Sequence, residues 1–215
     1  MFQPLIFSIL AIGVSCAMIT TGYAQPSGYA KINVKARVQL EIPDDWAIND
    51  AESRQQVRDF AQKLVSTKID HLAALSVSSF PTPSKMWVRV SFISMEPPIT
   101  QADLRQELRT NEKRALKELS DTFSQEMPAM WSALAKHGIK EVGRPSFAVE
   151  QLSGQTAIVI RYARTSAGEP SKTVKVSQYH VVLGQEKVLL TLSYVDGDAQ
   201  IASAHTRIKN SISIR

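Results

Sequence analysis

The C-terminal half of the chain contains four strand-like segments joined by turns that are too short for parallel pairing. Each segment is rich in apolar and β-branched residues, and they cover residues 146–152, 156–164, 174–183 and 187–194. Ser153-Gly154 and Gly184-Gln185 suit tight turns, and residues 166–171 supply a longer one. A parallel connection would need a crossover of about a dozen residues. The segments therefore predict consecutive antiparallel strands.

The N-terminal half alternates strand and helix patterns. Residues 32–42 read as the first strand, and residues 75–80 and 86–94 read as a hairpin. Asn49 or Asp50 can cap a helix whose apolar residues recur at helical spacing, namely Val57, Phe60, Ala61, Leu64 and Val65.

A long helix follows at residues 100–138. Thr100 and Asp103 resemble a capping box at its start, and Pro128 should kink or divide it. Its predicted apolar face consists of Leu104, Leu108, Ala115, Leu119, Phe123, Met127, Met130 and Leu134. Asp198 can cap a last helix, and Ile212 and Ile214 end the chain. Because helices bury their apolar stripes on a sheet, the order predicts an α+β fold with an antiparallel sheet of about six or seven strands, an α/β/α sandwich.

The start of the chain resembles a secretory leader. The first 25 residues contain no Asp, Glu, Lys or Arg, and Gly22-Tyr23-Ala24 has the small residues of a cleavage site. We expect a signal peptide at 1–24, cleaved after Ala24, a linker at 25–31 and a single domain at 32–215. An uncleaved anchor and a lipid anchor at Cys16 are the alternatives. We therefore expect a periplasmic or secreted protein with no membrane span after leader removal.

Cys16 is the only cysteine, so cleavage would leave a chain without disulfides or cysteine metal ligands. The formal net charge of +5 then belongs to the mature domain and favours anionic partners. We expect a protein or an anionic envelope component as the partner, and no nucleic acid.

The motifs of common catalytic and metal sites are missing from the sequence. There is no Gly-x-Ser-x-Gly elbow and no phosphate-binding glycine-rich loop. His71, His137, His180 and His205 are too far apart in sequence to form a local metal site. We therefore predict no catalytic residues, no metal site and no cofactor.

Two acidic pairs and three tryptophans have both structural and functional interpretations. Asp44-Asp45 and Asp196-Gly197-Asp198 could hold a hard cation, but both lie near helix starts, where capping is the favoured role. Trp46, Trp87 and Trp131 could stack on a ligand, but their apolar surroundings favour core packing. In Pro43-Asp44-Asp45-Trp46 we expect an architectural corner between the first strand and the first helix.

One charge pattern on the long helix is a candidate binding site. Arg105, Arg109, Lys113 and Lys117 follow one another at four-residue spacing. Like charges at this spacing repel by a few tenths of a kcal/mol per pair in an isolated helix. This series, the basic stripe, is either an ordinary solvated face or a surface that contacts an anionic partner.

Four stretches carry a family resemblance: IPDDW at the end of the first strand, LSGQTAIVIRYA around a hairpin, YHVVLGQEKVLLTLSYV in the last strand pair and RIKNSISI at the chain end. In this order they resemble the PsbP-like superfamily, an α/β/α sandwich named after an extrinsic photosystem II subunit and also found in bacterial exported proteins. The resemblance covers nearly the whole mature chain, although residues 100–137 exceed the helix expected there. It implies a protein that binds partners or supports assemblies, with no shared catalytic residue to carry over.

Two function classes follow. The first is an exported, non-catalytic binding or accessory protein of the bacterial cell envelope that acts through protein contacts. The alternative is an envelope hydrolase whose residues converge only in three dimensions, and a pocket lined by two or more of His180, Asp44, Asp45 and Asp196 would favour it.

Overall fold

The computed structural model describes residues 28–64, 69, 71–79, 83–167 and 169–215. The predicted leader, its cleavage site at Ala24 and Cys16 lie outside these residues, as do Val65 and Phe80.

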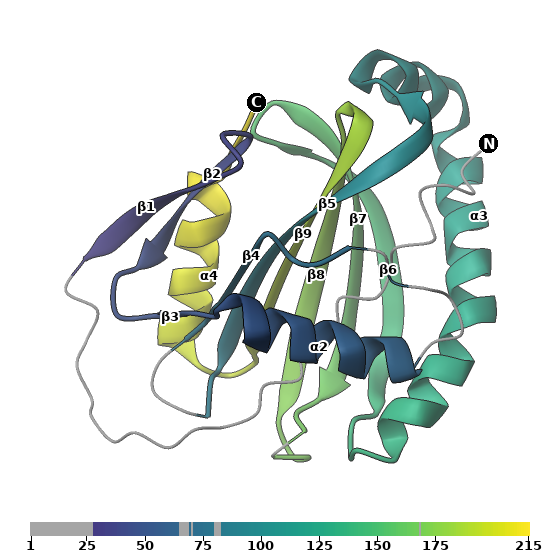
Figure 1. Cartoon of the computed structure of the whole chain (residues 1–215). Coiled ribbons are helices and arrows are strands. Elements are labelled where there is room, and N and C mark those ends of the chain that lie inside the picture. The colour runs from purple at the N-terminus through teal and green to yellow at the C-terminus, as the bar shows by residue number, and fades with distance from the viewer. Residues whose placement is uncertain (1–27, 65–68, 70, 80–82, 168) are drawn as a thin grey trace.

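A seven-stranded antiparallel sheet forms the centre of the fold (Figure 1). Its strands lie in the order β3-β4-β5-β9-β8-β7-β6, and every neighbouring pair is antiparallel. The strands are β3 (Ala47–Ile48), β4 (Leu75–Ser78), β5 (Met86–Ile99), β6 (Glu141–Leu152), β7 (Gln155–Thr165), β8 (Thr173–Val182) and β9 (Gly184–Val195). The four consecutive C-terminal strands and the β4–β5 pair confirm the sequence prediction.

A second, three-stranded sheet differs from the prediction. The segment predicted as a single strand at residues 32–42 is a hairpin of β1 (Tyr29–Val34) and β2 (Val38–Pro43), and β10 (Ser213–Ile214) pairs with β2. Residues 29–31 of the predicted linker therefore belong to β1. Lys35 and Ala36 form the turn with φ of 49° and 54°, and the Arg37 N–H donates to the Val34 carbonyl over 3.0 Å. Positive φ at both central residues usually requires Asn or Gly, so the sequence carried no turn signal.

Ala36→Gly should stabilise the fold by about 0.5–1 kcal/mol, because glycine adopts positive φ without steric strain. Urea denaturation measures the gain. The control is Ala30→Gly in β1, which should destabilise the fold by a similar amount. Glycine within a strand loses more conformational entropy on folding than alanine does. Equal destabilisation by both changes would contradict strain at Ala36.

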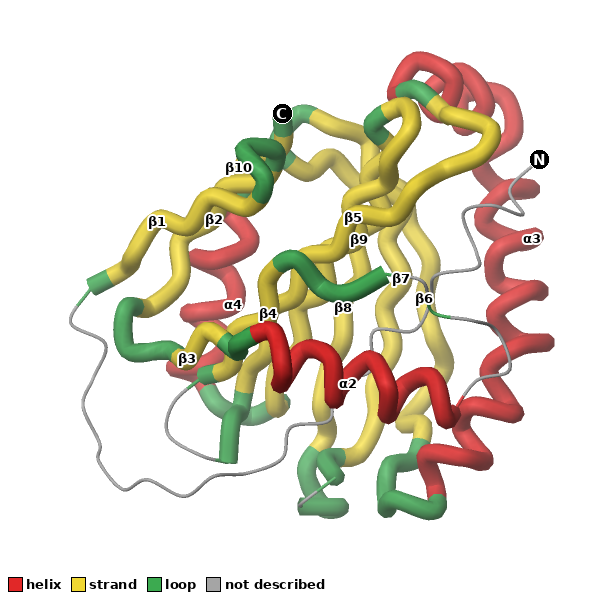
Figure 2. Tube along the Cα trace, in the orientation of Figure 1, coloured by secondary structure: helices red, strands yellow, loops and turns green. Residues whose placement is uncertain are grey.

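The helices lie on both faces of the large sheet (Figure 2). On one face α2 (Ala51–Leu64) and α3 (Gln101–Ala135) pack, with the buried side of α3 and Phe60 of α2 in a cluster that includes Ile160 and Val176. On the opposite face the small sheet and α4 (Ala199–Ser211) enclose a second cluster, which includes Ile208. The predicted α/β/α sandwich is therefore confirmed.

Helix starts are capped largely as the sequence predicted. The Ser53 N–H donates to Asp50 Oδ1 over 2.7 Å. Thr100 and Asp103 form a complete capping box, and Asp198 accepts hydrogen bonds from the N–H groups at the start of α4. These bonds satisfy donors that a helix leaves unpaired at its first turn.

All eight residues of the predicted apolar face of α3 are buried. Pro128 does not divide the helix, because α3 continues through it to Ala135; the helix is instead interrupted by non-helical φ/ψ at Asn111. Burial of Met127 and Met130 on either side of Pro128 favours the helical path there. At Asn111 the side-chain amide donates to Glu107 Oε1 over 3.2 Å, a local bond of the kind that competes with regular helix.

Candidate functional site

The basic stripe is exposed on α3. Arg105, Arg109, Lys113 and Lys117 are all solvent-accessible, and the non-helical Asn111 divides them into two pairs. Lys117 Nζ lies 2.5 Å from Asp121 Oδ2. Within the described residues, the other three cations form no salt bridge, while nearby Glu107 and Glu118 pair with Arg114. Three of the four stripe cations are therefore exposed without a salt bridge among the described residues, although α3 as a whole carries six carboxylates and five cations.

Pro43–Trp46 forms a corner, but it joins β2 to β3 and not directly to the first helix as predicted. β2 ends at Pro43, the Trp46 N–H donates to the Pro43 carbonyl over 3.1 Å, and the Trp46 side chain is buried at 8% exposure. Trp87 and Trp131 pack in or against the cluster on the other face, so the three rings do not form one platform.

Of the two acidic pairs, only Asp196 and Asp198 lie at a helix start. Asp44 and Asp45 lie in the turn between β2 and β3 and do not cap a helix; this corrects the prediction, because the intervening β3 places Asp50 at the start of α2 instead. Burial, opposed by a hydrogen bond to the backbone, raises the pKa of Asp45. Asp196 pairs with Lys175 over 2.9 Å, and Asp198 caps α4 while pairing with Lys85 over 2.8 Å.

The residues that would have favoured a hydrolase do not converge. His180 lies in β8 opposite Leu189 of β9. From Leu189 to Asp196 the chain spans roughly 23 Å at about 3.3 Å per residue. Asp44 and Asp45 lie in the turn that leads to β3, an edge strand four positions away from β8 in the large sheet. In the part of the chain that the structure describes, no three His, Cys, Asp or Glu residues form a metal-binding group. None of the described helices combines the length and hydropathy of a bilayer crossing.

A buried polar row crosses the face of the sheet that α2 and α3 cover. The row runs from Ser76 of β4 to Arg89 of β5, Thr191 of β9 and Gln178 of β8, each directly opposite the next. All four are buried, and the Thr191 hydroxyl has no hydrogen-bond partner. Directly opposite residues of an antiparallel pair share one face, so the row is a continuous polar surface.

Buried cations lie along and beside this row. Burial, together with nearby Arg164, lowers the pKa of Arg89 to about 10. Burial lowers the pKa of Lys187 to about 8. Among the described residues, the buried charged side chains are Arg89, Arg164 and Lys187, all of them cationic. This face of the sheet therefore concentrates positive charge.

His180 lies on the same face and is 2% exposed, with no hydrogen-bond partner at either ring nitrogen. Burial first, and then the charge of Lys187, hold its pKa well below 6.5. The imidazole is therefore neutral at physiological pH. His180 is therefore a residue of the sheet core.

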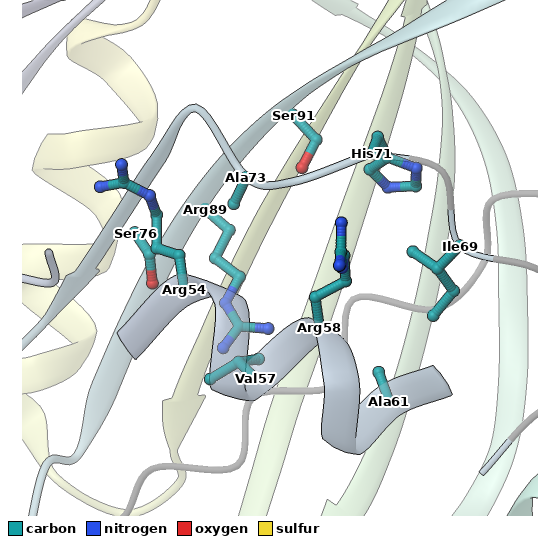
Figure 3. A pocket seen from close by; sticks show the side chains of 10 residues that line it. All are labelled: Arg54, Val57, Arg58, Ala61, Ile69, His71, Ala73, Ser76, Arg89 and Ser91. Atoms are coloured by element: carbon teal, nitrogen blue, oxygen red, sulfur yellow. The ribbon is translucent and has the colours of Figure 1, made fainter. Parts of the chain in front are cut away.

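A small, partly open cavity of about 40 Å³ lies between α2 and the sheet. Figure 3 shows its lining. The polar side chains are Arg54 and Arg58 of α2, His71 of the segment before β4, Ser76 of β4, and Arg89 and Ser91 of β5. Sequence reasoning missed this cavity because its walls come from segments far apart in the chain. The available signal was Arg89 and Ser91, which alternate with apolar residues in a strand-like segment.

No family model matches the sequence, and no curated protein matches it. Solved structures similar to this chain include cyanobacterial PsbP from Synechocystis, with 10% identity and a TM-score of 0.46 over 90% of this chain and 98% of that one. LpqN, involved in cell envelope biogenesis of Mycobacterium tuberculosis, has 16% identity and a TM-score of 0.42 over 82% of each chain.

A protein of Bacteroides thetaiotaomicron has 10% identity and a TM-score of 0.44, over 86% of this chain and 48% of that one. This chain therefore spans about half the length of the Bacteroides protein.

Proposed function

We propose that this protein is an exported, non-catalytic binding or accessory protein of the bacterial cell envelope, acting through contacts with a protein or an anionic envelope component. The observation that carries the proposal is the basic stripe on α3. Four cations are exposed on one helix, and three of them have no salt bridge within the described residues. The predicted leader supports export.

The arrangement of the stripe favours binding over a purely structural role. Arg105–Arg109 and Lys113–Lys117 keep regular four-residue spacing on either side of Asn111, so each pair is repulsive. The apolar side of α3 packs on the sheet and fixes the helix in place. An anionic partner would relieve the repulsion without any rearrangement of the fold.

Replacing both Arg109 and Lys113 with Gln should weaken partner binding while leaving the free protein equally or slightly more stable. The change removes one cation from each repulsive pair. A partner captured from envelope extract by the parent protein is identified by mass spectrometry, and its affinity is then measured at low and at high salt. Binding by the parent should weaken as salt rises, because exposed charges are screened over roughly 8 Å at physiological ionic strength.

Lys31→Gln with Arg37→Gln is the matched control, since both residues are exposed on the small sheet and their loss changes net charge equally. It should leave affinity unchanged. Undiminished binding of the Arg109/Lys113 variant at low salt would overturn the proposal, and a loss of stability would indicate a structural role for the stripe.

A further inference from the structure

The cavity under α2 has an unusual polar lining. Three arginines and one histidine are among the described residues that line it, and none of these lining residues is acidic. In Figure 3 the Arg89 side chain extends from β5 toward α2, and the Arg58 side chain extends from α2 toward the segment that carries His71. Arg58 and Arg89 therefore approach the cavity from opposite sides, while the guanidinium of Arg54 extends away from Arg58.

The donors around the cavity are held in place by the fold. Arg54 Nη1 donates to the Asn49 carbonyl over 2.7 Å, while its Nε is buried and has no hydrogen-bond partner. Ser76 Oγ accepts a hydrogen bond from Asn49 Nδ2 over 2.9 Å, which leaves the hydroxyl proton of Ser76 available to a ligand. Arg89 is only 6% exposed and lies in the polar row.

Arg58 is partly exposed, whereas Arg89 is buried. The Arg58 guanidinium lies 3.3 Å from Asp59, whose carboxylate is about half exposed and does not line the cavity. A pair so exposed to solvent is weak, so Arg58 can exchange this carboxylate for a bound anion.

We propose that this cavity binds a phosphate-type oxyanion, held by Arg54, Arg58 and Arg89 together with the hydroxyl of Ser76. Guanidinium groups form paired, charge-assisted hydrogen bonds with such anions, and groups on opposite walls match a tetrahedral ligand. A low-dielectric wall strengthens these bonds relative to those at an open surface.

The size of the cavity limits the ligand. A volume of about 40 Å³ holds a few water-sized groups, which suits one phosphate group but not an attached ring. Because the cavity is partly open, the phosphate of a larger molecule could enter while the remainder stays outside. Free phosphate and the headgroup of an anionic phospholipid are the two sources of this chemistry.

Titration of the purified full chain with inorganic phosphate, followed by ³¹P NMR and by thermal unfolding, tests the proposal. Chloride at matched ionic strength is the reference. We expect phosphate to raise the melting temperature above the chloride reference. Arg58→Gln should raise the dissociation constant for phosphate about tenfold or more. This is the loss of affinity expected when one charge-assisted hydrogen bond is removed. Arg89→Gln should weaken it at least as much where that variant folds.

A second arm separates the two sources. Flotation with vesicles of phosphatidylglycerol, compared with phosphatidylcholine, reports headgroup binding. Retention by phosphatidylglycerol vesicles that Arg58→Gln abolishes assigns the site to a lipid headgroup, whereas phosphate binding without such retention assigns it to a soluble phosphate. Either result supports the oxyanion site.

Lys63→Gln is the matched control, because Lys63 is exposed on the same helix and does not line the cavity. It should bind phosphate like the parent, and so should the Arg109/Lys113 stripe variant. The proposal is wrong if neither phosphate nor phosphatidylglycerol vesicles bind the parent, or if Lys63→Gln weakens binding as much as Arg58→Gln does.

Discussion

Lys187→Met should raise the free energy of unfolding at pH 7 by about 3 kcal/mol, the equivalent of a pKa that falls from 10.5 in the unfolded chain to about 8 in the fold. The Lys187 side chain is fully buried, and burial is the cause of the lowered pKa. Below pH 8 the ammonium stays charged inside the fold at the expense of stability. Methionine has a similar length and no charge, so it removes this penalty.

The pH dependence of the parent provides a second readout for Lys187. Between pH 8 and pH 10.5 the unfolded chain keeps the Lys187 proton while the folded chain loses it. Because the unfolded state then binds more protons, stability rises with pH across this window. Lys187→Met should lack this rise. Urea denaturation at pH 7, 8, 9 and 10 measures both effects.

Lys63→Met, on the exposed side of α2, serves as the control for loss of a lysine charge and should stay within about 0.5 kcal/mol of the parent. If the Lys187→Met protein were less stable than the parent at pH 7, the prediction would be wrong. The surroundings of the buried ammonium would then compensate its charge, and the ammonium would not lower the free energy of unfolding.

Lys187 also shows what the sequence could not determine. It lies near the start of a strand-like segment, where a lysine usually faces solvent. Whether it is buried depends on which face it occupies and on what covers that face. Lys187, Thr191 and Ser193 alternate with Val188, Leu190 and Leu192, so the segment carried the signal of one polar and one apolar face. The buried position of the polar face is a tertiary property.

Elements with dense local patterns were predictable. The apolar face of α3 repeats through eight residues at helical spacing, and all of them are buried. The strands from β6 to β9 are separated by glycine-containing turns or a longer loop, and their antiparallel order followed from loop length.

Elements that depend on distant contacts or unusual turns were not predictable. The β1–β2 turn uses Lys35 and Ala36 in a conformation that favours glycine, so the hairpin read as one strand. β10 pairs with β2 from the opposite end of the chain. The cavity joins α2 to β4 and β5, and no local spacing relates Arg58 to Arg89.

Trp46→Ala should lower the free energy of unfolding by about 3 kcal/mol, the usual loss for a buried aromatic ring. Trp46 is 8% exposed and belongs to the cluster between the small sheet and the large one, with Leu40, Ile42 and Val77. It follows the point where Pro43 ends β2 and precedes the edge strand β3, so its ring packs in the cluster between the two sheets. Truncation leaves a cavity that this corner cannot close by moving, because strands on both sides are hydrogen-bonded.

Thermal unfolding measures the loss, which corresponds to a fall of roughly 6–12 °C for a chain of this size. Ile48→Ala is the matched control at the same corner, since Ile48 is 58% exposed in β3 and its truncation should change stability by less than about 0.5 kcal/mol. The two variants separate packing from recognition. If Trp46→Ala kept the parent melting temperature but lost the captured envelope partner, Trp46 would be a contact residue and the corner at Pro43–Trp46 would belong to the binding surface.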